Sequence, residues 1–339
     1  MTTPDRSRCT LEDVAARAGV SRATVSRVVN GSPLVSVAAR RAVELAIDEL
    51  GYSPNRAARS LAGRRSETVA LVVSEPSVRL FADPFFARTT LGITGVLGGS
   101  RYQLVLLMMH SDADRTRVER HLLRGGADGV LLLSTRTGDP LPGRLAAAGI
   151  PSVMAGRPPE GVDAGFVDAD NVGGARLAVA HLIAGGRRVV ATVAGPSDMV
   201  PGADRQAGWE KALAEAGRPA DRTLVAEGDF TRSGGAAATR TLLARRPGID
   251  ALFVGSDLMA LGALDALREA GRQVPEDVAV VGFDDSELAR TADPPLTTVR
   301  QPIEQLGTEM ARLLLAQLDD DAAPAGLVLR TELVVRGSG

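Results

Sequence analysis

The stretch Ser21-Arg22-Ala23-Thr24-Val25-Ser26-Arg27-Val28-Val29-Asn30 decides what the first part of this 339-residue chain forms. Its apolar residues recur at helical spacing and predict a helix whose buried face is made by Val25, Val28 and Val29. Ser21 is suited to cap that helix, because its hydroxyl can accept from backbone N–H groups of the first turn. The stretch therefore predicts an amphipathic helix with arginines on its exposed surface.

Two further helices are expected around this one. Thr10 stands three residues before Asp13, the spacing of a capping box, so a first helix should begin there. The short turn Ala18-Gly19-Val20 separates the first two helices, as in a helix-turn-helix. Ser36 can cap a third helix, whose apolar positions are Val37, Val43, Leu45, Ile47 and Leu50. These three helices predict an all-α DNA-binding head over residues 10–51.

The composition, 45% hydrophobic and 24% charged, is that of a globular protein, and the length suffices for two or three domains. No apolar stretch reaches the roughly 18 residues of a membrane span, and no signal peptide is evident, so we expect a cytoplasmic protein. The single cysteine, Cys9, excludes an intramolecular disulfide and a cysteine-based zinc site. Residues 1–9 lack apolar periodicity, and we expect them to form a disordered tail.

Charge is distributed unevenly along the chain. Residues 1–65 contain 11 arginines and 6 acidic residues, whereas the whole chain has a net charge of −2. A basic head on an acidic body favours a protein that binds nucleic acid through one end. A charge run alone usually marks only a solvated face; its position on a helix-turn-helix strengthens the nucleic-acid interpretation.

Three consecutive motifs carry a resemblance to a known family. The turn AGVS (residues 18–21), the helix TVSRVVN (24–30) and the segment YSPNRAARSLA (52–62) resemble the headpiece of the LacI/GalR family of bacterial transcription regulators. The resemblance extends from Thr10 to about Arg336. It implies a second helix that reads DNA and, over residues 52–66, a hinge helix and linker.

The resemblance implies the DNA contacts residue by residue. Arg22, Ala23 and Arg27 match the family's base-reading positions; arginine can contact guanine O6 and N7, and an alanine methyl can touch a thymine methyl. Ser21, Thr24 and Asn30 suit phosphate contacts. The alternative for each arginine is a phosphate contact or a solvated face.

The hinge segment forms the second implied DNA contact. Asn55 can cap a short helix over residues 56–62, which is marginal alone and is expected to fold with DNA and a partner copy. The resemblance implies that Leu61 of this helix enters the minor groove, where such a wedge kinks DNA. Arg59 can reach the minor groove or a phosphate, and an ordinary core role for Leu61 is the alternative.

From Thr68 onward, short apolar runs alternate with helical stretches, which predicts doubly wound α/β structure. Each apolar run is expected to be buried on both faces, as parallel strands are. The runs are 69–73, 103–108, 129–133, 189–193, 251–254 and 278–282. Two such units resemble the lobes of a periplasmic sugar-binding protein. The resemblance implies a first lobe of 67–166 plus about 301–328, and a second of 167–300 plus about 329–336.

Side chains at strand ends predict a small-molecule site between these lobes, because ligands of open α/β sheets bind there. Arginine and carboxylate groups can fix hydroxyls while aromatic rings cover a sugar face. One of Phe85 and Phe86 is expected to be core, and the alternative for Asp284 and Arg205 is a pair with each other across the cleft. Asp257 is expected to cap a helix, as is the turn Asp170-Asn171. The candidates for effector binding are Asp83, Phe85, Phe86, Arg157, Arg205, Phe230, Ser256 and Asp284.

The predicted function is a ligand-responsive, allosteric transcriptional regulator. We expect a repressor that binds a palindromic operator as a homodimer, because no leucine heptad follows residue 335. The expected effector is a sugar, with a purine or nucleoside as the alternative. A doubly wound enzyme is disfavoured, because no phosphate-binding loop, nucleophile elbow or metal-spaced histidine cluster occurs. No cofactor and no metal are expected, and an exported sugar-binding protein would lack the head.

Overall fold

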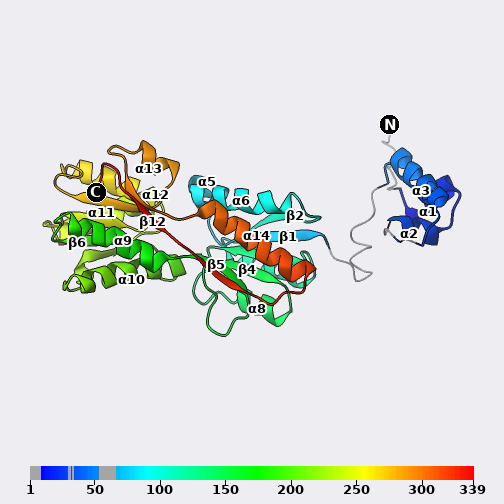
Figure 1. The fold of residues 1–339 in the computed structure, drawn as a ribbon, viewed down its shortest axis with the longest axis horizontal. Helices are drawn as coiled ribbons and strands as arrows, with labels where there is room; N and C mark the ends of the chain where they lie inside the picture. The colour runs from blue at the N-terminus through cyan, green and yellow to red at the C-terminus, as the bar shows by residue number, and fades with distance from the viewer. Residues whose placement is uncertain (1–8, 30–31, 33, 53–65) are drawn as a thin grey trace. The chain divides into compact units, whose positions relative to one another are not determined.

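The computed structural model describes residues 9–29, 32, 34–52 and 66–339. The chain divides into two compact units at Ser66 and Glu67, a helical head and an α/β core (Figure 1). Four of the predicted DNA-binding residues lie outside the described residues, namely Asn30, Asn55, Arg59 and Leu61.

The head contains three helices, α1 (Leu11–Ala18), α2 (Arg22–Val29) and α3 (Val37–Leu50). The capping box predicted for α1 is present: the Asp13 N–H donates to Thr10 Oγ1, and the Thr10 N–H donates to Asp13 Oδ2. Ser36 caps α3 through the Ala39 N–H. The core of the head comprises Val14, Ala15, Val25, Val28, Val43, Ala46 and Tyr52.

Two expectations about the head are wrong. Leu45 is 56% exposed and Val37 is 84% exposed, because α3 turns the face of Val43 and Ala46 toward the core instead. Leu50, in the last turn, is also exposed. Cys9 does not belong to a free tail, since it packs against the core of the head.

The first lobe of the core has a six-stranded parallel sheet in the order β11-β5-β4-β3-β1-β2. Alternate residues of β1 join different hydrophobic clusters, so helices cover both faces of this sheet. The strands are β1 (Thr68–Val73), β2 (Gln103–Met108), β3 (Gly129–Leu133), β4 (Ser152–Ala155), β5 (Gly165–Ala169) and β11 (Gly326–Leu329). The helices are α5 (Ser77–Ala82), α6 (Pro84–Leu97), α7 (Asp112–Leu123), α8 (Leu141–Ala147) and α14 (Ile303–Asp319).

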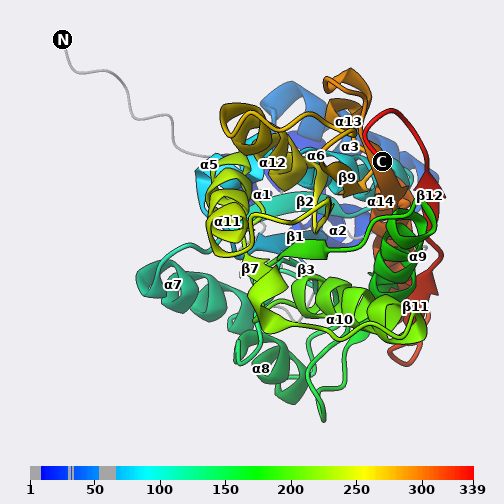
Figure 2. The same cartoon turned by 90° about the vertical axis from the view of Figure 1, so that its left-hand side faces the viewer.

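The second lobe has a sheet in the order β12-β10-β9-β8-β6-β7, parallel except for the β10–β12 pair. Figure 2 views the chain from the side of this lobe, with β7, β9 and β12 labelled. Its strands are β6 (Val190–Ala194), β7 (Val225–Glu227), β8 (Ala251–Val254), β9 (Ala279–Asp284), β10 (Thr297–Arg300) and β12 (Glu332–Val334). Its helices are α9 (Asn171–Ala184), α10 (Val200–Glu215), η1 (Arg222–Leu224), α11 (Arg232–Arg245), α12 (Asp257–Glu269) and α13 (Glu287–Thr291).

The chain passes between the lobes at three places: after β5, after β10, and between β11 and β12. The second passage brings α14 back to the first lobe, where it packs beside α6 (Figure 1). The predicted fold class, a helical head with two doubly wound parallel lobes, is therefore confirmed. Among the described helices, none combines the length and the apolar character of a membrane span.

One strand departs from the prediction that every apolar run is buried on both faces. β2 pairs with β1 alone and forms an edge of the first sheet. As a result, Val105 is 40% exposed and Leu106 is 45% exposed. The strands β4, β5, β7, β10, β11 and β12 were not among the predicted runs.

Candidate functional site

The second helix of the head presents polar and basic side chains on its surface. Ser21, Arg22, Ala23 and Arg27 are exposed, while Val25 and Val28 are buried beneath them. Ser21 Oγ accepts from the Thr24 N–H at 3.1 Å and contacts the Thr24 hydroxyl at 2.9 Å. The first turn of α2 is therefore capped, and its exposed groups are placed together on one structured surface.

An acidic residue accompanies the predicted base-reading arginine. Arg22 Nε lies 3.0 Å from Glu12 Oε1 of α1, and both side chains are more than half exposed. No pattern in the sequence marked Glu12 as part of this surface. An exposed ion pair is weak, so a phosphate or a guanine can compete for the guanidinium.

A cavity of about 150 Å³ lies between the two lobes of the core, at the carboxyl ends of their strands. Seven of the eight predicted effector-binding residues line it: Asp83, Phe85, Arg157, Arg205, Phe230, Ser256 and Asp284. Phe86 does not, because its ring is 2% exposed and belongs to the hydrophobic core of the first lobe. The ring of Phe85, next to it, is partly exposed and faces the cavity.

Arg205 on α10 is the most constrained cation of the cavity, being 4% exposed. Its Nε–H donates to Asn171 Oδ1 at 2.9 Å, and Nη1 donates to the carbonyl oxygen of Gly255. Nη1 also lies 3.7 Å from Asp284 Oδ1. Arg205 and Asp284 therefore pair with each other, but within the second lobe and not across the cleft as expected. Both groups nevertheless line the cavity.

Asp284, at the end of β9, accepts a hydrogen bond from Gln301 Nε2 at 2.5 Å. Burial raises the pKa of its carboxyl well above the usual value, and the charge of Arg205 opposes that rise. Its backbone has φ 120°, and that of Asp285 has φ 51°, both in the left-handed region that non-glycine residues rarely adopt. The surroundings must therefore hold this loop in place.

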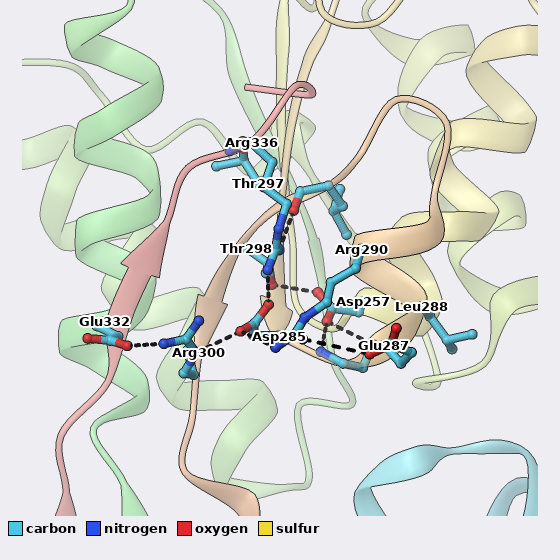
Figure 3. A network of polar contacts seen from close by, with 12 residues as sticks. Asp257, Asp285, Glu287, Leu288, Arg290, Thr297, Thr298, Arg300, Glu332 and Arg336 are labelled. Atoms are coloured by element: carbon cyan, nitrogen blue, oxygen red, sulfur yellow. Dashed lines mark hydrogen bonds and ion pairs between the residues drawn. The ribbon is translucent and has the colours of Figure 1, made fainter.

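The loop after β9 is held by a buried network of carboxylates (Figure 3). Asp285, with a side chain 1% exposed, accepts from Arg300 Nε at 2.7 Å and from Arg336 of the C-terminal segment. Asp257 accepts from the Ser286 N–H at 2.7 Å and from the hydroxyl of Thr298. These bonds fix the residues that follow Asp284 and so orient its carboxylate.

The expectation that Asp257 caps α12 is wrong. Ser256 is the N-cap, because its hydroxyl accepts from the Met259 N–H at 3.2 Å. Asp257 is fully buried under the loop after β9, and burial raises its pKa to about 7. The two residues of the turn predicted at Asp170-Asn171 have different roles. Asp170 caps α9 through the Gly173 N–H, whereas Asn171 lines the cavity.

Two ion pairs join the lobes beside the cavity. Arg157, after β4, donates to Asp168 at 2.8 Å and, with both carboxylate oxygens accepting, to Asp204 of α10. Arg136, after β3, donates to both oxygens of Asp198 at 2.7 Å. Several residues that line the cavity were not predicted from the sequence: Arg79, Ser134, Arg136, Asp168, Asn171 and Gln301.

Comparison with known proteins agrees with this arrangement. Residues 10–55 match the model of the lacI family of bacterial regulatory proteins, and residues 179–339 match a periplasmic binding protein-like domain. A head of the first kind on a core of the second defines a DNA-binding transcriptional regulator.

The relatives make the assignment specific. The regulator CelR of Thermobifida fusca is 53% identical over 338 residues, which cover 98% of this chain and 99% of that protein. The ribose operon repressor of Escherichia coli K12 is 36% identical, with 88% and 89% covered. The chain belongs to the lacI family of bacterial regulatory proteins.

Two solved structures are similar over almost the whole chain. A CelR–cellobiose complex has a TM-score of 0.79 and 52% identity, and covers 98% of this chain and 100% of that one. The lac repressor dimer, bound to operator and the anti-inducer ONPF, has a TM-score of 0.83 and 31% identity, with 98% and 99% covered.

Proposed function

We propose that this regulator is a repressor whose affinity for DNA is controlled by an uncharged sugar bound between the two lobes. The observation that carries the proposal is the position of Arg205 and Asp284, 3.7 Å apart at the cavity. A guanidinium and a carboxylate side by side supply donors and acceptors for neighbouring hydroxyls. The rings of Phe85 and Phe230, also in the lining, can cover the apolar face of a sugar.

The charges of the cavity favour a neutral ligand. Each arginine that lines it has a carboxylate partner: Arg79 has Glu75, Arg136 has Asp198, Arg157 has Asp168 and Asp204, and Arg205 has Asp284. No positive charge of these arginines is left without a carboxylate for a phosphate to neutralise. A phosphorylated sugar would also face Asp83 and Asp284. An unphosphorylated sugar has no charge, so it needs no unpaired cation and is not repelled by these carboxylates.

The relatives support the same class of effector. A regulator that is 52% identical has been solved with cellobiose, and another that is 36% identical is a ribose operon repressor. We therefore take cellobiose as the first probe. The shape of the cavity, rather than its charge, is expected to separate a disaccharide from a monosaccharide.

DNA recognition is proposed to use the exposed surface of α2, with Arg22, Ala23 and Arg27 reading bases, and Ser21, Thr24 and Asn30 contacting phosphates. Asn55 would cap the hinge helix, Leu61 would enter the minor groove, and Arg59 would contact the minor groove or a phosphate. A dimer places two such helices on successive major grooves, so the operator should be an inverted repeat. The sugar can change DNA affinity only through its different affinity for the two lobe arrangements.

An apolar surface on the first lobe supports the proposed homodimer. α5 contacts α6, and α6 contacts β2, so their exposed apolar side chains lie on adjoining elements. We call them the α5–α6–β2 surface: Val78 (82% exposed), Phe81 (78%), Leu91 (61%), Val105 (40%) and Leu106 (45%). Several large apolar side chains exposed on adjoining elements are typical of a protein interface.

The proposed function is tested with the full-length protein and fluorescent operator DNA. The thermal shift and the anisotropy of the complex are measured with cellobiose, glucose, ribose, glucose 6-phosphate and adenosine. A neutral sugar should raise the melting temperature and release the DNA. A response to glucose 6-phosphate alone, or to adenosine alone, would refute the neutral-sugar proposal while leaving DNA binding intact.

A further inference from the structure

Arg79, on α5 of the first lobe, lies between aromatic rings of both lobes. Its guanidinium carbon is 5.7 Å from the centroid of the Phe86 ring in the first lobe and 4.9 Å from that of Phe230 in the second. Arg205 continues the row, 5.9 Å from Phe230 and 3.8 Å from Phe283. Arginines and aromatic rings thus alternate from the core of one lobe to the core of the other.

This row depends on the two lobes being close together. Phe86 and Phe283 belong to the hydrophobic cores of different lobes, and Arg79 and Phe230 meet across the cavity between them. The attraction between a guanidinium and a ring is strongest where water is excluded, as it is here: Arg79 is 9% exposed and Phe230 is 4% exposed. Phe230 has φ 62°, a backbone conformation that is rare for phenylalanine, so its surroundings must hold it in place.

The hydrogen bonds of Arg79 are incomplete. Its Nη1 is paired with Glu75, which is 2% exposed, but its buried Nε has no partner among the residues that the structure describes. The corresponding atom of Arg205 donates to Asn171 at 2.9 Å. A buried N–H without an acceptor is costly, and native proteins rarely retain one without a reason. Arg79 lines the effector cavity, so an oxygen of a bound ligand is one acceptor that can approach its guanidinium.

We propose that Arg79 is an effector-binding residue whose Nε–H donates to an oxygen of the bound sugar, while Phe86 and Phe230 hold its guanidinium between the closed lobes. The inference rests on the proposed function, because it requires a ligand in this cavity. The proposed hydrogen bond also limits which sugars can bind. A guanidinium donates and cannot accept, so the sugar must present a hydroxyl or ring oxygen to α5.

The experiment measures cellobiose, its monodeoxy analogues and its carbocyclic analogue by titration calorimetry on the full-length protein. In the unaltered protein, the analogue that lacks the contacted oxygen should bind about 10- to 100-fold more weakly than cellobiose, the range for a charged hydrogen bond. In Arg79→Met, cellobiose and that analogue should bind with equal affinity. The affinity differences between cellobiose and the other analogues should remain as in the unaltered protein. Arg79→Lys keeps the charge without the Nε–H, so it should also bind cellobiose and that analogue with equal affinity.

Two further variants separate binding from folding. Arg79→Met alone leaves Glu75 buried without its partner, so Glu75→Gln/Arg79→Met is measured beside it. Arg88→Ala is the matched control, since Arg88 pairs with Glu304 at 3.2 Å on the same lobe and does not line the cavity. It should bind every analogue as the unaltered protein does.

The possible outcomes distinguish the two proposals. The inference is overturned if the Arg79 variants bind cellobiose normally, or if they bind it weakly while every analogue keeps its original penalty. The second result would mean that Arg79 acts only on folding. If the unaltered protein binds neither these sugars nor glucose or ribose, the proposed effector class fails, and the role of Arg79 fails with it.

Discussion

Arg157 of the first lobe and Asp204 of the second form a two-oxygen ion pair, with distances of 2.8 and 2.6 Å from the same guanidinium nitrogen. The same arginine donates to the buried carboxylate of Asp168. This contact connects the two lobes at the edge of the effector cavity. It therefore stabilises the arrangement of the two lobes in this structure.

We predict that breaking this pair weakens sugar binding moderately. Arg157 is 45% exposed, so Arg157→Gln and Asp204→Asn should each reduce cellobiose affinity by about two- to fivefold, the range for a solvated pair. The double variant should bind cellobiose with no lower affinity than the single variant that binds it less tightly. Calorimetric titration measures all three affinities. Arg144→Gln, which removes the pair with Glu119 within the first lobe, should leave affinity unchanged. Additive losses would argue against a direct coupling of Arg157 and Asp204.

Asp284→Asn should separate the two activities of the regulator. The substitution removes the charge that faces Arg205 and replaces one carboxylate oxygen by an amide donor, while the remaining oxygen can still accept from Gln301. We expect cellobiose affinity to fall by about 10- to 100-fold, with operator affinity within about twofold of normal. Calorimetry and anisotropy on the same preparation measure both. Normal sugar affinity would remove Asp284 from the binding site.

Glu12→Gln should strengthen operator binding. The change frees Arg22 from its ion pair and removes a negative charge from the DNA-binding surface. Because both side chains are exposed, the gain should be about two- to fivefold in anisotropy titrations, and it should shrink at high salt. Glu49→Gln, which removes the pair with Arg17 on the head, is the control. A loss of affinity in Glu12→Gln would mean that this pair supports the fold of the head.

Stability should depend on pH through Asp257. Burial raises its pKa from 3.8 to about 7, so the folded protein holds this proton more tightly than the unfolded chain. The contribution of Asp257 to the free energy of unfolding therefore falls as the pH rises from about 4 to about 7. Urea unfolding at several pH values should show a flatter dependence for Asp257→Asn. Asp265→Asn on the same helix, where the pKa is lowered, should not flatten it.

Leu106→Glu should disrupt the homodimer. It places a charge in the α5–α6–β2 surface on the exposed edge strand β2. Sedimentation should show a monomer, and operator affinity should fall by at least about tenfold, because two heads would no longer be linked. Leu327→Glu, on the edge strand at the opposite side of the same sheet, should remain dimeric. A dimeric Leu106→Glu would place the interface elsewhere.

Much of the fold is predictable because its signals are local. The Thr10 capping box and the Ser36 cap bind N–H groups of their own helices, and apolar runs such as 129–133 become fully buried strands. Errors arose where burial depends on distant neighbours. β2 looks as apolar as β3, yet its place at the edge of the sheet leaves Leu106 exposed.

The candidate cavity divides in the same way. Its predicted residues follow strands, so their positions are consequences of parallel α/β structure. Arg79 carried no such signal, because α5 is a short helix and its aromatic neighbour Phe230 lies on the other lobe. Gln301 was also missed, since it follows β10 in a passage between lobes and is recognisable only by its bond to Asp284.

The sequence by itself determined the class of this protein: a capped, arginine-lined recognition helix in front of two α/β lobes, all encoded by periodicity and caps within a few residues. Only the tertiary structure decided which charges meet. Asp285 finds Arg336 51 residues away, and Arg157 finds Asp204 on another lobe. Such pairs depend on how the sheets and lobes pack against one another. No local pattern of residues encodes the distance between two charged groups on separate segments.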